Sequence, residues 1–252
     1  MPDVTSNTTD GRQSSGALAS SLGWDNTHDT TGFGSPVITD SNQSFFGPRA
    51  QFASFRGGIY FINRCFFDFN LSGVSTGVTA VNFKTVTDTN GGHDAIVLKS
   101  GHDPSNTSTK WFSTWLTGLG GTLSGWSNSD SQVVPYTNNV TMAGSAGTTT
   151  FPFNSVGVND VNSLAGTSTA FKIVLMNYDF DYLDVDPQPT GGSQITGLNF
   201  ADHGTVGKRP FLEITVGTAS GYGHKVINVP ASDISKVIGV ATADIDKVNG
   251  VD

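Results

Sequence analysis

The sequence predicts an all-β fold, and within that class a single β-sandwich. Only 13% of the 252 residues are charged, whereas glycine (31) and phenylalanine (17) are abundant, a composition that suits short strands joined by turns. Glu213 is the only glutamate among the 21 acidic residues. Aspartate favours turns and caps, whereas glutamate favours helices. Apolar, β-branched segments recur between turn-rich spacers, which indicates a sandwich rather than a parallel α/β sheet.

The clearest predicted strand covers residues 60–69. Side-chain alternation divides it into two faces. One face carries Phe61, Cys65, Phe67 and Phe69, and the other carries Ile62, Arg64, Phe66 and Asp68. Cys65 is interpreted as a small buried hydrophobic residue. Because it is the only cysteine, the chain cannot form an internal disulfide or a thiolate metal cluster.

The other predicted elements follow in order along the chain. Further strands are expected at 79–86, 95–99, 149–153, 171–177 and 211–216. Pro210 precedes the last of them, a position that strands tolerate. Two brief helices are expected at 109–116 and 159–164.

The sandwich is expected to span residues 35–216, with different segments on either side. Residues 1–34 are polar and have few apolar side chains, which predicts an extended arm that lies along a neighbouring protein, with Trp24 as its anchor. Residues 217–223 are rich in glycine and predict a flexible linker. Residues 224–252 are expected to form a docking tail that begins with a strand-like run at 225–229.

The tail contains one short segment twice. Residues 232–240 and 243–251 are identical at six of nine positions. Each copy begins with cap-type residues and ends near a glycine, which predicts two short helical turns. Helices this short are marginal alone, so their apolar side chains either fold back on the chain or bind another protein, and we favour the second. These side chains are Ile234, Val237, Val240, Ile245, Val248 and Val251.

Charge and hydropathy exclude several partners. The net charge of −8 disfavours nucleic acid, which needs a basic surface. No apolar run is long enough to predict a membrane span. The first residues lack the basic start and apolar core of a secretory signal, so we expect synthesis in a cytoplasm and release by lysis or by a route without a signal peptide.

Four aspartates crowd together after the strand predicted at 171–177. They are Asp179, Asp181, Asp184 and Asp186. A calcium site is one interpretation, because carboxylates this close repel unless water or a cation separates them. The loop lacks the central glycine and closing glutamate of an EF-hand, so we favour a solvated acidic loop and expect no metal.

No catalytic constellation is recognisable. Adjacent histidine and aspartate residues flank the strand at 95–99, but neighbours on a strand point to opposite faces and cannot act as an acid–base couple. There is no nucleophile elbow and no phosphate-binding loop. We therefore expect neither catalysis nor a cofactor.

Three tryptophans offer a candidate sugar-binding platform. Trp111 and Trp115 share one face of the predicted helix, and Trp126 follows, with Tyr136 further along. Such a platform could stack against sugar rings. The alternative is that the same residues close one end of the sandwich, and we favour this because large aromatic residues are more often buried.

Two segments resemble known proteins. Residues 64–71 and 79–83, Trp111 and Trp115, and residues 208–215 follow the order found in DNRLRE-type β-sandwich domains. That resemblance covers about residues 45–216 and implies a jelly-roll-like domain similar to carbohydrate-binding modules. The tail resembles the tandem Ile-x-Lys-Val-Asn-Gly-Val segments of structural proteins from environmental phages.

Together these features predict a virion protein. We expect a phage structural component, either a capsid decoration or part of a tail or fibre, that forms homo-oligomers and binds other virion proteins. The alternative is a non-catalytic carbohydrate-binding module that adheres to host surface glycans. An enzyme explains nothing that these two functions leave open.

Overall fold

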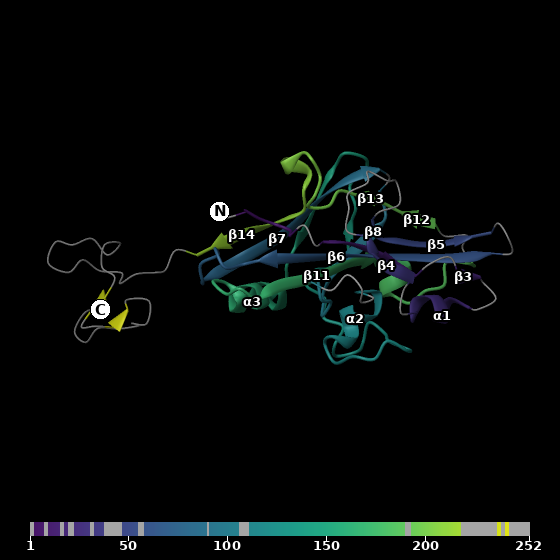
Figure 1. The fold of residues 1–252 in the computed structure, drawn as a ribbon, viewed down its shortest axis with the longest axis horizontal. Helices are drawn as coiled ribbons and strands as arrows, with labels where there is room; N and C mark the ends of the chain where they lie inside the picture. The colour runs from purple at the N-terminus through teal and green to yellow at the C-terminus, as the bar shows by residue number, and fades with distance from the viewer. Residues whose placement is uncertain are drawn as a thin grey trace. The chain divides into compact units, whose positions relative to one another are not determined.

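The structure is a computed structural model (Figure 1). It describes residues 3–7, 10–15, 18–19, 23–30, 33–37, 47–54, 58–89, 91–105, 111–189, 193–217, 236–237 and 240–241. The chain divides into two units, Met1–Thr215 and Val216–Asp252. The first unit is built on two antiparallel sheets, which confirms the predicted all-β, sandwich-like fold.

The smaller sheet has the strand order β1-β14-β7-β10, and β13 also pairs with β7. Its strands are β1 (Asp3–Thr5), β7 (Val78–Thr89), β10 (Thr148–Pro152), β13 (Gly197–Leu198) and β14 (Phe211–Val216).

The larger sheet has the order β12-β5-β6-β11-β8-β9, and β6 also pairs with β2 and β3, while β2 pairs with β4. Its central strands are β5 (Arg49–Ala53), β6 (Ile59–Asn70), β8 (Asp94–Lys99) and β11 (Ala170–Asn177). Its shorter strands are β2 (Gly11–Ser14), β3 (Leu18–Ala19), β4 (Phe33–Val37), β9 (Val140–Thr141) and β12 (Ser193–Ile195).

The helices are short. They are α1 (Trp24–His28), α2 (Trp111–Thr117), α3 (Ser155–Leu164), a π-helical turn η3 (Tyr178–Tyr182) and a 3₁₀ turn η4 (Val206–Lys208). None of these described helices is long and apolar enough to cross a membrane. The six strands predicted between residues 60 and 216 fall on β6, β7, β8, β10, β11 and β14. The two predicted helices fall on α2 and α3.

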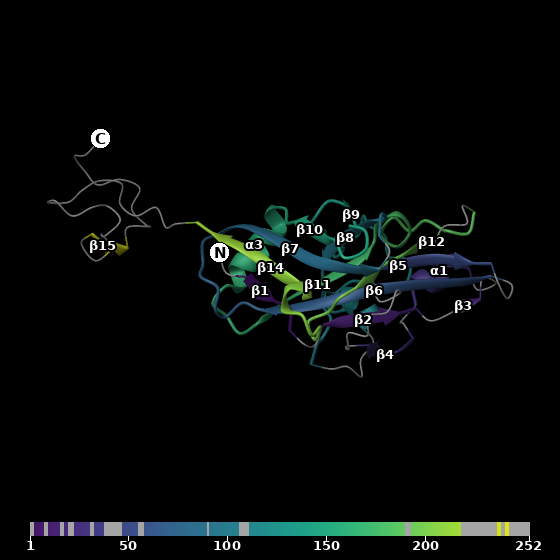
Figure 2. The ribbon, with the colours of Figure 1, turned by 90° about the horizontal axis from the view of Figure 1, so that it is seen from above.

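The core between the two sheets is aromatic. Phe67 and Phe69 of β6 face Phe83 of β7, with ring centroids 5.0 and 6.1 Å apart. Phe83 also stacks on Phe151 of β10, and Phe69 lies against Phe171 of β11. Figure 2 shows β7 and β14 lying over β6 and β11. Phe67 and Phe69, predicted to share one face of this strand, both face the smaller sheet.

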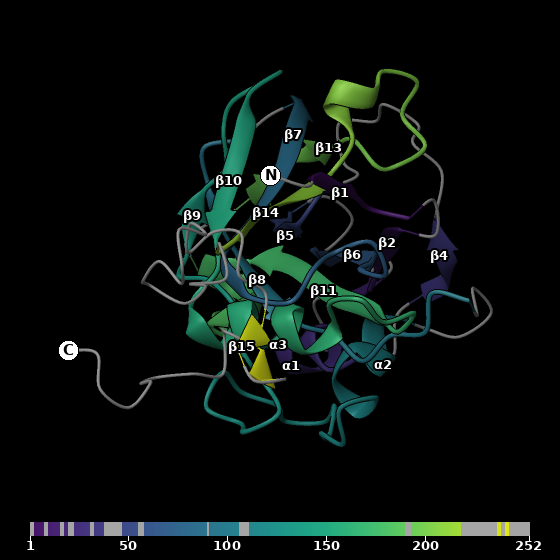
Figure 3. The same ribbon diagram turned by 90° about the vertical axis from the view of Figure 1, so that its left-hand side faces the viewer.

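A third layer covers the other face of the larger sheet. Phe66 of β6 and Val174 of β11 belong to one apolar cluster with Trp111 and Trp115 of α2. Ile62 of β6 joins a second cluster that includes residues of α1 and α2. Figure 3 shows the smaller sheet above the larger one and α2 below it. Because both faces of β6 are covered, even its polar residues Asn63, Arg64 and Asp68 are buried.

The prediction of an extended arm over residues 1–34 is wrong for its described parts. β1 pairs with β14 in the smaller sheet, and β2 and β3 pair with β6 in the larger sheet. Strand pairing satisfies backbone groups whatever the side chains are, so a polar segment can join a sheet without the apolar pattern that reveals most strands. This segment is part of the first unit.

The prediction of helical turns in the tail is also wrong where the second unit is described. Lys236–Val237 (β15) pairs with Val240–Ala241 (β16) in an antiparallel ladder. Valine favours strands, and a two-residue connection that contains a glycine is typical of a hairpin. The strand predicted at 225–229 and the linker residues after Gly217 lie outside the described residues.

Candidate functional site

A buried arginine lies at the centre of the layer between α1, α2 and the larger sheet. Arg64 is fully buried in β6. Its partner Asp181 comes from the π-helical turn η3, where the side chain of Asn177 caps the turn by accepting a hydrogen bond from the Phe180 N–H at 3.0 Å. Such turns often occur at functional sites, and this one brings a carboxylate under the sheet.

The contact between Arg64 and Asp181 is bidentate. Nε donates to Oδ2 at 3.0 Å and Nη2 donates to Oδ1 at 2.7 Å. The guanidinium also donates to the carbonyl oxygens of Phe112 and His28, at 3.3 and 3.2 Å. Each guanidinium nitrogen therefore has an acceptor, as a buried cation requires.

Aromatic rings surround the same guanidinium. Its central carbon lies 4.0 Å from the ring centroid of Phe112, 5.2 Å from Trp126 and 5.5 Å from Trp115. His28 stacks on Trp126 with ring centroids 4.3 Å apart. Cation–π contacts of this kind add to the ion pair, and they leave the cation enclosed by protein. This cluster is a structural centre.

The tryptophans proposed as a sugar platform belong to this enclosed layer. Trp111, Trp115 and Trp126 are at most 1% exposed, so they cannot stack on a ligand from solution. The platform hypothesis is wrong. The favoured alternative, that these residues close one end of the sandwich, is right about their burial, but they cover the outer face of the larger sheet. Trp111 and Trp115 are buried because α2 turns its apolar face toward the larger sheet, and Trp126 packs in the same cluster.

Trp24 does not serve as an anchor for a neighbouring protein. It lies in α1 and is 5% exposed. Its indole Nε1 donates to Oδ1 of Asp184 at 2.8 Å, and its ring lies 5.6 Å from that of Tyr60. It packs within the first unit because α1 is held against β6.

The four clustered aspartates do not converge. Asp181 binds Arg64, Asp184 accepts from Trp24, Asp179 accepts from Gln194 at 2.7 Å, and Asp186 accepts from the hydroxyl of Tyr60 at 2.9 Å. Within the described ranges, no group of three histidine, cysteine or acidic side chains is placed to hold a metal ion. Each carboxylate instead binds a different residue, and together they fasten η3 and the turn that follows it to α1, β6 and β12.

The adjacent His–Asp pairs differ in geometry. Nδ1 of His28 lies 3.0 Å from Oδ1 of Asp29, because this pair sits at a helix end and not in a strand. The ring of His28 is buried, so the pair is closed to substrate. His102 is also buried, with Nδ1 2.8 Å from Oγ of Ser100, and burial lowers the pKa of His102 to about 3.

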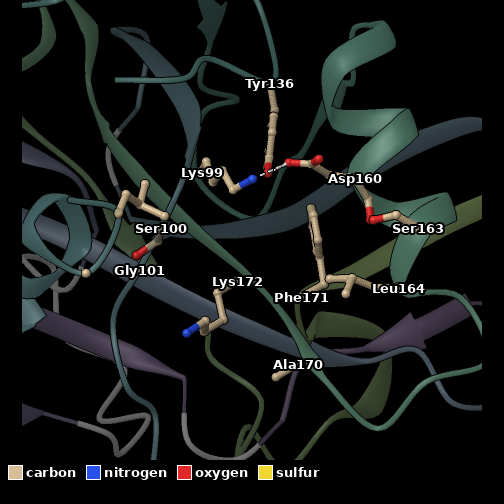
Figure 4. Close-up of a pocket in the computed structure, with 12 residues that line it drawn as sticks. Lys99, Ser100, Gly101, Tyr136, Asp160, Ser163, Leu164, Ala170, Phe171 and Lys172 are labelled. Carbon is tan, nitrogen blue, oxygen red and sulfur yellow. Dashed lines mark hydrogen bonds and ion pairs between the residues drawn. The ribbon is translucent and has the colours of Figure 1, made fainter. Parts of the chain in front are cut away.

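A pocket of about 240 Å³ opens where β8 ends, between α3, the C-terminal end of α2 and the start of β11. Figure 4 shows Lys99 and Tyr136 converging on Asp160 of α3. Nζ of Lys99 lies 2.8 Å from Oδ2 of Asp160, and the Tyr136 hydroxyl donates to the same oxygen at 2.5 Å. Burial and this hydrogen bond raise the pKa of Tyr136.

Local structure fixes the walls of this pocket. The side chain of Asn154 caps α3 by accepting from the N–H groups of Val156 and Gly157, at 3.0 and 3.1 Å. On the opposite wall, the backbones of Gly101 and Gly118 touch. A Cβ on Gly101 would lie 2.5 Å from the carbonyl carbon of Gly118, so only glycine permits this approach.

Neither polar centre was found from the sequence. Arg64 and Asp181 are 117 residues apart, and Lys99 and Asp160 are 61 apart. The one available signal was Arg64 itself, because a cation within an otherwise apolar strand requires a buried carboxylate partner. The pocket had no comparable signal, since its residues are common at strand ends and on exposed helix faces.

Comparison of the sequence with protein-family models and with curated proteins finds no match. No function can therefore be transferred to this chain from a relative.

Proposed function

We propose that this chain is a structural component of a phage virion, either a capsid decoration or part of a tail or fibre appendage, and that its second unit attaches it to the particle. One observation carries the proposal. Both copies of the repeated segment lie in a unit of their own, Val216–Asp252, separate from the sandwich. A separate unit of this kind suits attachment, because it can bind a partner while the sandwich stays folded.

The repeat itself supports attachment to another protein. The apolar residues Ile234, Val237 and Val240 recur in the second copy as Ile245, Val248 and Val251. Val237 and Val240 pair directly in the β15–β16 ladder, and the other four positions lie outside the described residues. A two-stranded hairpin is marginally stable by itself, so this unit gains from a partner.

The proposal is tested on the particles themselves. Virions of the encoding phage are purified on a density gradient, and their proteins are quantified by mass spectrometry. The chain should co-sediment with the major capsid or tail proteins at a fixed copy number. Its recovery only from the soluble fraction of the lysate would contradict the proposal.

We further propose that the sandwich is not an enzyme. The polar groups of the Arg64 centre bind one another. The four aspartates in η3 and in the turn after it each bind a different residue. Purified protein should show only background turnover on polysaccharides, esters and peptides. Turnover that is lost on replacing Asp179, Asp181, Asp184 or Asp186 with asparagine would refute this part.

A further inference from the structure

The pocket at the end of β8 keeps unused hydrogen-bonding capacity at its mouth. The side chains of Lys99 and Asp160 are 39% and 30% exposed. Both known partners of Asp160 bind Oδ2, so Oδ1 accepts no hydrogen bond from a described side chain. The Lys99 ammonium has three donors and uses one on Asp160. A ligand in the pocket therefore meets a free acceptor beside free donors.

The acceptor of Asp160 beside the donors of Lys99 favours some classes of ligand over others. A carboxylate or phosphate ligand would meet a second cation, Lys172, in the lining, but it would also lie beside the Asp160 carboxylate in a protein of net charge −8. An apolar ligand would take the Lys99–Asp160 ion pair out of water without replacing its hydrogen bonds. A hydroxyl group both donates and accepts, so two adjacent hydroxyls fit the acceptor and the donor together.

The volume of the pocket and its other lining residues narrow the class of ligand further. Pockets for drug-sized ligands measure roughly 300–1,000 Å³, and this one, at about 240 Å³, suits a single small ring. Leu119 and Leu164 supply apolar surface for the C–H face of such a ring, and Ser163 adds a hydroxyl at the mouth. The mouth opens to solvent, so further units of a chain could extend outward.

We propose that this pocket binds one saccharide ring, with two vicinal hydroxyls held by Lys99 and Asp160. The proposal does not depend on attachment to a virion. Attachment is measured on particles and sugar binding on the isolated chain, so either can fail while the other stands. Tyr136 is a positioning residue, because its hydroxyl donates to Oδ2 of Asp160 and so fixes the carboxylate beside Lys99.

The test uses the full chain and a panel of methyl glycosides of common hexoses, their N-acetyl derivatives and deoxyhexoses. Saturation-transfer NMR identifies binders, and titration gives their dissociation constants. We expect at least one pyranoside with vicinal hydroxyls to bind in the millimolar range. Asp160→Asn and Lys99→Met should each weaken it by about tenfold or more, since each removes a charge-assisted hydrogen bond.

A matched control comes from the other lysine–carboxylate ion pair among the described residues. Nζ of Lys84 lies 2.8 Å from Oε1 of Glu213 on the smaller sheet, away from the pocket, so Lys84→Met should leave sugar binding unchanged. Ser163→Phe provides a second variant that blocks the mouth at an exposed helical position and spares the core. Thermal unfolding confirms that each variant is folded.

Three results would overturn the proposal. The first is that no glycoside in the panel binds. The second is that binding survives both Asp160→Asn and Ser163→Phe in folded protein. The third is that Lys84→Met weakens binding as much as Lys99→Met does, because the effect would then reflect the overall charge.

Discussion

At the scale of single residues, Arg64 shows how a buried charge is accommodated. The guanidinium and the Asp181 carboxylate are each fully buried. Desolvation of such a pair costs several kcal/mol per ion, and only good geometry with additional hydrogen bonds offsets that cost. The bidentate contact, two carbonyl acceptors and three aromatic rings provide those conditions.

Removing one member of this pair should be strongly destabilising. Asp181→Asn leaves the Arg64 cation buried without a counter-ion, so the free energy of unfolding should fall by about 3–5 kcal/mol. Arg64→Met combined with Asp181→Leu should be less damaging, because neither charge remains. Denaturant titration of the three proteins measures the difference.

Lys84→Met serves as the control for this measurement. The Lys84–Glu213 pair has a similar separation but is about a quarter exposed at both ends. Exposed pairs contribute about 0–1 kcal/mol, so this variant should change stability little. Equal losses from Asp181→Asn and Lys84→Met would contradict the role given to the buried pair.

His102 should make stability depend on pH. Its pKa is lowered to about 3 by burial, with a smaller contribution from Lys172, and Asp103 opposes the shift. An unfolded histidine titrates near about 6.5, so the unfolded chain takes up this proton first as pH falls. Its contribution to stability is therefore complete above about pH 6.5 and is lost progressively toward pH 3.

The measurement compares the chain with His102→Gln by denaturant unfolding at several pH values between 7.5 and about 4. The original protein should lose more stability across this window than the variant. Parallel curves would show that His102 does not titrate as its burial implies.

At the scale of elements, the long strands and two helices could be predicted because their side chains carry the information. β6 alternates between two apolar faces, and α2 presents Trp111 and Trp115 on one side. β1 and β2 were missed because pairing with β14 and β6 supports them through the backbone. The π-helical turn η3 was missed because its buried carboxylate, Asp181, has its partner 117 residues away in the sequence.

The cap of α3 provides a test at this scale. Asn154→Ala removes the acceptor for two N–H groups of the first turn, which should lower the free energy of unfolding by about 1 kcal/mol. Asn154→Asp keeps that acceptor and loses only the donor to the Pro135 carbonyl, so it should cost less. Equal losses in the two variants would assign the effect to the Pro135 contact and not to the cap.

At the scale of the whole molecule, the sandwich was predictable and its third layer was not. Alternation along β6 indicates two apolar faces but does not say what covers the second. α1 and α2 cover it, and α1 lies in a segment whose composition indicates an arm. The tryptophans remained a candidate sugar platform beside the favoured interpretation of burial, because sequence alone does not distinguish a buried aromatic face from an exposed one.

The division of the chain gives the most direct test of the proposed attachment. A chain that ends at Thr215 retains the whole first unit. It should therefore unfold at the same temperature as the full chain, and it should be absent from purified particles. A full-length chain with serine at Val237, Val240, Val248 and Val251 should also be lost from particles, whereas one with serine at Asp233 and Asp246 should remain.

The decisive measurement is the copy number per particle of the full chain and of the chain ending at Thr215, determined by quantitative mass spectrometry on gradient-purified virions. We expect a fixed copy number for the full chain and none above background for the shortened one. Equal copy numbers would show that the second unit does not attach this protein to the particle.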